Sequence, residues 1–205
     1  NIRNLIKKLD ESNVDIIELG HFKKDVNNPD QTLSSKIEYF EDLANKNIKN
    51  NSYCTVMTRP DKFDIRNISE YKKDSKIKGI RFAFYPYHFD LLIDQIKVCE
   101  EKGYDIFINP VGISCYKKND IINILRKISK FSPSYISIVD TFGALDAQKL
   151  IEIYEIFNNE LRDDIGIGIH LHENMSLSFS IAKEVLLKRN VKRNLIIDAS
   201  LQGMG

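Results

Sequence analysis

Two histidines one residue apart, His170 and His172, lie in the stretch "IGIHLHENMSL" at residues 167–177. An extended strand places every second side chain on the same face, so the two imidazoles would point the same way, about 7 Å apart. Imidazole nitrogens are common ligands of divalent metals. The spacing therefore predicts two ligands of one metal ion, although two unrelated polar groups at a strand end would show the same pattern.

Polar side chains also lie near the carboxyl ends of other apolar runs. A charged group in a strand buried on both faces is costly unless it has a partner. In a parallel barrel these strand ends converge on one mouth, where active sites of that architecture lie. We therefore expect one polar site to contain Glu18, Arg81, Asn109, Asp140, His170, His172 and Asp198.

Structural roles are the alternatives for several of these residues. Glu18 and Arg81 also suit an ion pair inside the barrel, and Asp198 suits a capping role better than catalysis. His21 and His88 lie just past predicted strands, where a role as surface loop residues is expected more than a role as catalytic bases.

Seven short runs rich in Ile, Val, Phe and Tyr predict the strands that would carry these groups. Most are continuous apolar runs, which is typical of parallel strands covered on both faces. Amphipathic stretches that predict helices lie between them; one of these, at 90–103, places Leu91, Leu92, Ile96 and Cys99 on one stripe. The predicted strands are 14–20, 52–58, 79–85, 104–110, 135–141, 166–172 and 195–201.

Strict alternation of helices and strands predicts a parallel α/β sheet with right-handed crossovers. Seven strands, with a helix and no strand before the first, favour a (β/α)8 TIM barrel that lacks its first strand and last helix, with unpaired strand edges on both sides of the gap. We expect one catalytic domain over 1–205, incomplete at both ends. An open doubly wound sheet is the alternative, although no glycine-rich phosphate fingerprint follows the first strand.

The composition is that of an ordinary globular protein. The chain has 205 residues and a net charge of +1, so nucleic acid and membrane are not expected partners. Its three cysteines contain no paired motif and are expected to be small core residues in a reducing cytoplasm. No apolar run approaches the ~18 residues of a membrane span, and no signal peptide is visible.

Two late segments, "HLHENMSLS" at 170–178 and "IDASLQGMG" at 197–205, resemble paired motifs of the metal-dependent pyruvate aldolases. These 4-hydroxy-2-oxovalerate aldolase-like enzymes belong to a metallolyase superfamily that also contains hydroxymethylglutaryl-CoA lyase, isopropylmalate synthase and homocitrate synthase. The segments "VDTFGAL" at 139–145 and "VDIIELG" at 14–20 are weaker matches in the same order.

The resemblance implies a divalent-metal-dependent lyase or aldolase acting on a 2-oxo acid. His170 and His172 would be metal ligands. Asp140 and Glu18 would line the site, Asp140 as a candidate catalytic residue and Glu18 as a substrate-binding one. Arg81, Asn174 and the backbone at Gly203 would contact the substrate. Mn²⁺ is the expected ion, with Mg²⁺, Zn²⁺ or Co²⁺ as alternatives.

The chain departs from the family pattern at its start. The family's first-strand segment with an Asp ligand and a substrate-binding Arg is absent, as is the catalytic His that follows it. His21 and His88 are the candidate substitutes for that base. An acyl-CoA condensing synthase, a non-catalytic metal- or ligand-binding barrel, and a homo-oligomer or partner domain or subunit all stay open.

Overall fold

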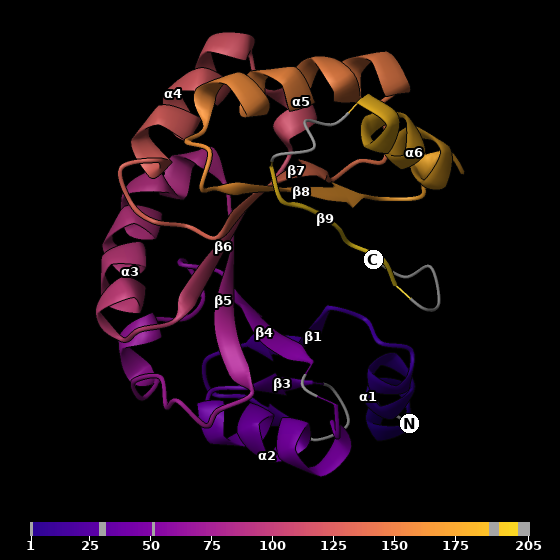
Figure 1. Ribbon diagram of the computed structural model, residues 1–205. Coiled ribbons are helices and arrows are strands. Elements are labelled where there is room, and N and C mark those ends of the chain that lie inside the picture. The colour runs from indigo at the N-terminus through magenta and orange to yellow at the C-terminus, as the bar shows by residue number, and fades with distance from the viewer. Residues whose placement is uncertain (1, 29–31, 51, 189–192, 201–205) are drawn as a thin grey trace. The chain divides into compact units, whose positions relative to one another are not determined.

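The computed structural model describes residues 2–28, 32–50, 52–188 and 193–200. The chain divides into two compact units, Asn1–Ile106 and Phe107–Gly205 (Figure 1). No helix within the described ranges has both the length and the apolar character needed to cross a bilayer.

The first unit is built on three parallel strands, β1 (Ile16–Phe22), β4 (Tyr53–Thr58) and β5 (Ile77–Phe84). Two very short strands extend this sheet beyond β1. β3 (Leu33–Ser34) pairs with β1 in parallel, and β2 (Asn27–Asn28) pairs with β3 in antiparallel orientation. The order in this unit is therefore β2-β3-β1-β4-β5.

β3 covers part of an edge that the sequence predicted to be unpaired. It pairs with His21 and Phe22 at the carboxyl end of β1, so the prediction of a free edge there was wrong. A glycine makes this approach possible. Gly20 has a φ of +147°, and a Cβ at this position would lie 2.1 Å from the carbonyl oxygen of Thr32. Any larger residue would push the β3 segment away.

Three helices pack on the first unit's strands: α1 (Ile2–Glu11), α2 (Ile37–Asn47) and α3 (Phe89–Glu101). The 3₁₀ turn η2 (Pro86–His88) leads into α3. Strict alternation was wrong between β4 and β5, where the chain forms only the 3₁₀ turn η1 (Ile65–Asn67).

Local polar groups favour this turn over a longer helix. The Asp64 carboxylate accepts a hydrogen bond from the Arg66 N–H, and the Asn67 side chain donates to the Asp64 carbonyl. Such short side-chain contacts to the backbone compete with helix propagation.

The described part of the second unit contains four parallel strands in sequence order, β6 (Asp105–Pro110), β7 (Tyr135–Asp140), β8 (Gly166–Leu171) and β9 (Leu195–Ile197). The boundary between the units falls inside β6. β7 and β8 are buried over most of their length, as the continuous apolar runs predicted.

Helices α4 (Lys118–Ile128), α5 (Ala147–Glu160) and α6 (Ser178–Lys188) lie side by side over β7 and β8 (Figure 1). The 3₁₀ turn η3 (Ile113–Cys115) joins β6 to α4. Each helix directs a regular set of apolar side chains inward; in α5 the buried residues are Leu150, Ile153, Tyr154 and Phe157.

All seven predicted strands occur, six of them with boundaries within two residues of those expected. The seventh, predicted at 195–201, is shorter: β9 ends at Ile197, and residue 201 lies outside the described residues. Three local predictions were wrong. Leu91 is 46% exposed and lies off the buried stripe of α3. Cys115 is exposed, whereas Cys54 and Cys99 are core residues as expected. His21 lies inside β1 rather than after it, because the strand extends to Phe22.

Candidate active site

The histidine pair lies at the carboxyl end of β8. His170 is the fifth residue of this strand and His172 follows it directly. Their ring centroids are 5.1 Å apart and the ring planes meet at 86°. The pair is therefore close enough for both imidazoles to contact one small ligand or ion.

Glycines on the same face of β8 allow side chains of β7 to approach its backbone closely. A Cβ on Gly166 would lie 2.3 Å from the Tyr135 ring, and one on Gly168 would lie 2.2 Å from Ser137 Oγ. The "GIGIH" pattern therefore lets the side chains of Tyr135 and Ser137 pack against β8 at the two positions that precede His170 on the same face.

Each histidine is oriented through its Nδ1 atom. His170 Nδ1 lies 2.8 Å from Asp198 Oδ2, and His172 Nδ1 lies 2.8 Å from the Thr141 carbonyl oxygen. A carbonyl only accepts, and an ionised carboxylate only accepts, so both Nδ1 atoms donate. In the neutral rings the lone pair is therefore on Nε2, which is the tautomer of imidazoles that bind a metal through Nε2.

The donor set fits part of a divalent-metal site. Two Nε2 atoms with carboxylate and carbonyl partners behind them match the usual outer shell of metal-binding histidines. Among the described residues, no group of three or more His, Cys, Asp or Glu side chains is suited to a metal ion. His170 and His172 would thus supply two ligands and leave the other positions to substrate, water or further groups.

Asp140 is 1% exposed and ends β7. Its two carboxylate oxygens accept the N–H groups of Ala144, at 3.1 Å, and Leu145, at 2.9 Å. The carboxylate therefore closes the turn that leads into α5. A catalytic role for Asp140 stays a prediction, and the structure gives it a clear role in positioning this turn.

Thr141 is a residue that sequence reasoning missed. Its hydroxyl oxygen accepts the Gly112 N–H at 2.7 Å, while its carbonyl accepts from His172. Gly143, with a φ of +58°, packs so closely that a Cβ would lie 2.6 Å from both Asn174 Cβ and the His172 carbonyl oxygen. In the sequence, only the segment "DTFG" at residues 140–143 indicated that this turn could position a site residue.

In the first unit, Glu18 and Arg81 form an ion pair with a distance of 3.1 Å between Arg81 Nε and Glu18 Oε2. The Arg81 side chain is 6% exposed and that of Glu18 is 28% exposed. The structural alternative considered for this pair is therefore observed. Their contact with substrate stays a prediction.

The other two histidines also belong to the first unit. Burial lowers the pKa of His21, so its imidazole is neutral near pH 7. His88, in η2, has its Nδ1 3.7 Å from Asp61 Oδ1. The Asp61 carboxylate also accepts two hydrogen bonds from Arg59. Burial alone would raise the pKa of Asp61, but these bonds to Arg59 hold it below its usual value.

Three predicted site residues remain to be placed. Asn109 is buried near the end of β6. Asn174 is exposed in the turn after β8, next to Gly143. Gly203 lies outside the described residues, so a backbone anion site there stays a prediction. The expectation that Glu18, Arg81 and Asp140 face one cavity with the histidine pair also stays a prediction.

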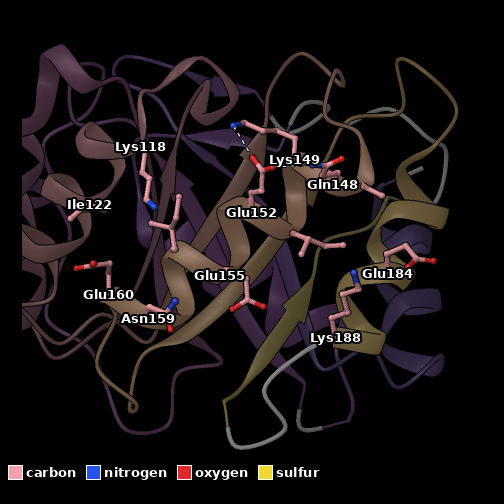
Figure 2. Close-up of a pocket in the computed structure, with 13 residues that line it drawn as sticks. Lys118, Ile122, Gln148, Lys149, Glu152, Glu155, Asn159, Glu160, Glu184 and Lys188 are labelled. Carbon is pink, nitrogen blue, oxygen red and sulfur yellow. Dashed lines mark hydrogen bonds and ion pairs between the residues drawn. The ribbon is translucent and has the colours of Figure 1, made fainter.

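A pocket of about 970 Å³ lies elsewhere in the second unit, along the outer faces of α4, α5 and α6. Figure 2 shows charged side chains around it, including Lys118, Glu155 and Lys188. None of the predicted site residues within the described ranges lines this pocket. It is therefore separate from the histidine pair.

No family model matches the chain. Several solved structures resemble it. The N-terminal domain of an aldolase-type protein from Bacteroides vulgatus is 16% identical, with a TM-score of 0.75 over 100% of this chain and 68% of that chain. Hydroxymethylglutaryl-CoA lyase from Pseudomonas aeruginosa is 12% identical, with a TM-score of 0.66 over 97% of this chain and 68% of the lyase chain.

The carboxyl transferase domain of Rhizobium etli pyruvate carboxylase, solved with pyruvate, is also similar. It is 12% identical, with a TM-score of 0.59 over 79% of this chain and 29% of that chain. Similarity at these identities concerns the fold. The chain has a parallel α/β fold that matches part of a (β/α)8 barrel, which confirms the predicted fold class. This fold is shared with enzymes of aldolase, lyase and carboxyl transferase type.

Proposed function

We propose that this chain is the catalytic domain of a divalent-metal-dependent carbon–carbon lyase or aldolase that acts on a 2-oxo acid. One observation carries the proposal. His170 and His172 are both fixed through Nδ1, so both present a basic Nε2 at the end of the same strand. The resemblance of both late motifs to 4-hydroxy-2-oxovalerate aldolases supports this activity within the broader class.

Bond cleavage next to a ketone requires stabilisation of an enolate. A divalent ion held by His170 and His172 would supply Lewis acidity toward the oxygen atoms of a 2-oxo acid. Mn²⁺ suits a mixture of imidazole and oxygen ligands, and Mg²⁺, Zn²⁺ or Co²⁺ are alternatives. The pyruvate present with the similar carboxyl transferase domain supports a 2-oxo acid as the substrate class.

The remaining roles concern substrate binding and proton transfer. We assign the Arg81 guanidinium to a substrate carboxylate, since its planar fork suits that group. Glu18 would hold Arg81 in place, as its ion pair does in this structure. Asn174 would contact the substrate, and Asp140 would keep the adjacent turn in shape. His21 or His88 would take the substrate proton on an imidazole nitrogen.

Proton exchange tests the chemistry directly. We expect the complete protein to exchange the methyl protons of pyruvate with D₂O only when a divalent ion is present, as followed by ¹H NMR. Exchange that persists in excess EDTA contradicts the metal-enolate mechanism. Condensation of pyruvate or another 2-oxo acid with an acyl-CoA, without aldol cleavage, assigns the protein to the synthase alternative.

Metal binding tests the two ligands separately from turnover. His170→Ala and His172→Ala should each abolish calorimetric binding of Mn²⁺ while circular dichroism shows an intact fold. Gln148→Ala, in the separate pocket on α5, is a control that should bind like the wild type. Wild-type affinity in either histidine variant removes that histidine from the ligand set. Metal binding without any turnover favours a non-catalytic barrel.

A further inference from the structure

We propose that Thr141 is a positioning residue that sets the orientation and tautomer of His172. This inference rests on the proposed function, because it gives Thr141 a purpose at a metal site. Both polar groups of Thr141 contribute to this role. The carbonyl oxygen orients the His172 imidazole, and the hydroxyl keeps that carbonyl in place.

The contacts join three successive strand ends. Gly112 follows β6, Thr141 follows β7 and His172 follows β8. The Gly112 N–H donates to Thr141 Oγ1 at 2.7 Å, and His172 Nδ1 donates to the Thr141 carbonyl at 2.8 Å. Thr141, at the end of β7, therefore connects the candidate ligand His172 to the loop that follows β6.

The Thr141 carbonyl has little freedom to rotate away. On its N-terminal side, the buried Asp140 carboxylate accepts the N–H groups of Ala144 and Leu145 and closes the turn. On its C-terminal side, Gly143 packs against the backbone of His172 and Asn174. The hydroxyl contact with Gly112 is a third anchor, and it depends on the Thr141 side chain.

This arrangement has a chemical consequence for His172. A fixed acceptor at Nδ1 keeps the proton there and the lone pair on Nε2. Partners of this kind typically change metal affinity by about 10- to 100-fold when they are removed. Thr141→Val keeps the carbonyl and the side-chain shape but removes the acceptor for Gly112. We expect the turn to loosen and metal affinity to fall by about 10-fold.

The test uses the complete protein at pH 8. Long-range ¹H–¹⁵N NMR without metal reports the Nδ1–H tautomer of His172, and calorimetry with Mn²⁺ reports affinity. Thr141→Val should lower the Nδ1–H fraction and weaken Mn²⁺ binding, whereas Thr141→Ser should restore both. Thr58→Val is the matched control, since Thr58 is fully buried and its hydroxyl has no hydrogen-bond partner among the described residues.

The outcomes separate this inference from the proposed function. An unchanged His172 tautomer in Thr141→Val overturns the positioning role, even if the wild type binds Mn²⁺ tightly. No Mn²⁺ binding by the wild type overturns the metal site, and the tautomer measurement then still decides whether Thr141 orients the ring. If Thr141→Val does not fold, Thr141→Ala provides the same two measurements without the branched side chain. Equal effects in Thr58→Val would also contradict the inference.

Discussion

At the scale of single residues, the two candidate ligands have chemically different partners. His170 donates to the carboxylate of Asp198, and His172 donates to a backbone carbonyl. A carboxylate raises the basicity of the imidazole that it binds, whereas a carbonyl mainly fixes the tautomer. We therefore expect His170 to be the ligand whose strength depends most on a side chain elsewhere in the sequence.

Asp198→Asn tests this dependence. The amide keeps the shape of the carboxylate but removes its charge, and its NH₂ group can favour the other tautomer of His170. We expect Mn²⁺ affinity to fall by about 10- to 100-fold while the melting temperature changes little. Calorimetry and thermal denaturation measure the two quantities. Wild-type affinity in this variant would show that Asp198 only caps its neighbours, as its position in the sequence also suggested.

The strand period predicted the histidine pair but not what holds it. Alternation places His170 and His172 on one face in any sequence that forms this strand. The partner of His172 is the backbone carbonyl of Thr141. Every residue carries such a group, so no residue type in the sequence indicates that this one binds an imidazole. Asp198 carries a visible carboxylate, yet its pairing with His170 depends on the register of β8 with β9. Register is a tertiary property that the local pattern left open.

At the scale of elements, several buried polar residues fix the loops between helices and strands. Asp10, at 2% exposure near the end of α1, is the clearest example. Its carboxylate accepts hydrogen bonds from the N–H groups of Lys49 and Asn50 and from the Ser52 hydroxyl. It therefore holds the segment between α2 and β4 against α1.

We predict that Asp10→Ala lowers the free energy of unfolding by about 2–4 kcal/mol, because buried donors lose their acceptor. Urea denaturation measures this loss. Burial alone would raise the pKa of Asp10, but hydrogen bonds from Asn50, Lys49 and Ser52 hold it below its usual value of 3.8. The stabilisation is therefore present above about pH 4 and lost as pH falls through the lower folded-state pKa.

The pH dependence gives this prediction a second measurement. The difference in stability between the wild type and Asp10→Asn should be constant between pH 5 and 7 and shrink below about pH 4. A difference that grows on acidification would mean that the ionised form of Asp10 does not stabilise the fold.

Arg193 has a comparable role at the end of α5. Its side chain, 3% exposed, donates to the carbonyl oxygens of Asn158, Leu161, Arg162 and Ile165. These carbonyls belong to the last turn of the helix and the loop after it. The guanidinium thus satisfies acceptors that would otherwise be buried without a donor.

Arg193→Lys should destabilise the protein by about 2–4 kcal/mol, nearly as much as Arg193→Ala, because an ammonium group does not reach so many acceptors in the geometry of the fork. Chemical denaturation measures both variants. Arg162→Lys is a useful comparison, since Arg162 is more exposed and its exchange should cost less. A wild-type midpoint for Arg193→Lys would show that charge alone is sufficient.

The elements themselves followed the sequence closely where apolar periodicity was strong. β7, β8 and α5 have uniform patterns and occur as expected. The departures have local causes. η1 replaces a helix because Asp64 and Asn67 form hydrogen bonds with the nearby backbone. β3 forms because Gly20, which has no Cβ, lets the Thr32 carbonyl approach β1 closely. A two-residue strand has too few residues to produce a periodic signal.

At the scale of the whole molecule, a net charge of +1 leaves little electrostatic repulsion between copies of the chain. α6 adds exposed apolar side chains: Phe179 is 85% exposed and Leu187 is 70% exposed. They lie about 80° apart around the helix, so they belong to the same outer face. Low charge and exposed apolar groups both favour self-association.

We predict that the double substitution Phe179→Ser and Leu187→Ser raises solubility and reduces light scattering of the 205-residue chain near neutral pH. Stability should change by no more than about 0.5 kcal/mol per site, since neither side chain is buried. Light scattering against concentration and thermal denaturation give the two readings. Ile181→Ser, on the buried face of the same helix, is the contrasting variant and should lower stability strongly. Unchanged scattering in the double variant would assign association to another surface.

The environments of the three cysteines make the chain convenient for spectroscopy. Burial raises the pKa of Cys54 to about 12 and raises that of Cys99 further, so neither forms a thiolate readily. Cys115 is exposed in η3, three residues after Gly112. A maleimide fluorophore should therefore label one position without any engineering. From there, its emission would report motion of the loop that binds the Thr141 hydroxyl, in real time and in the unmodified sequence.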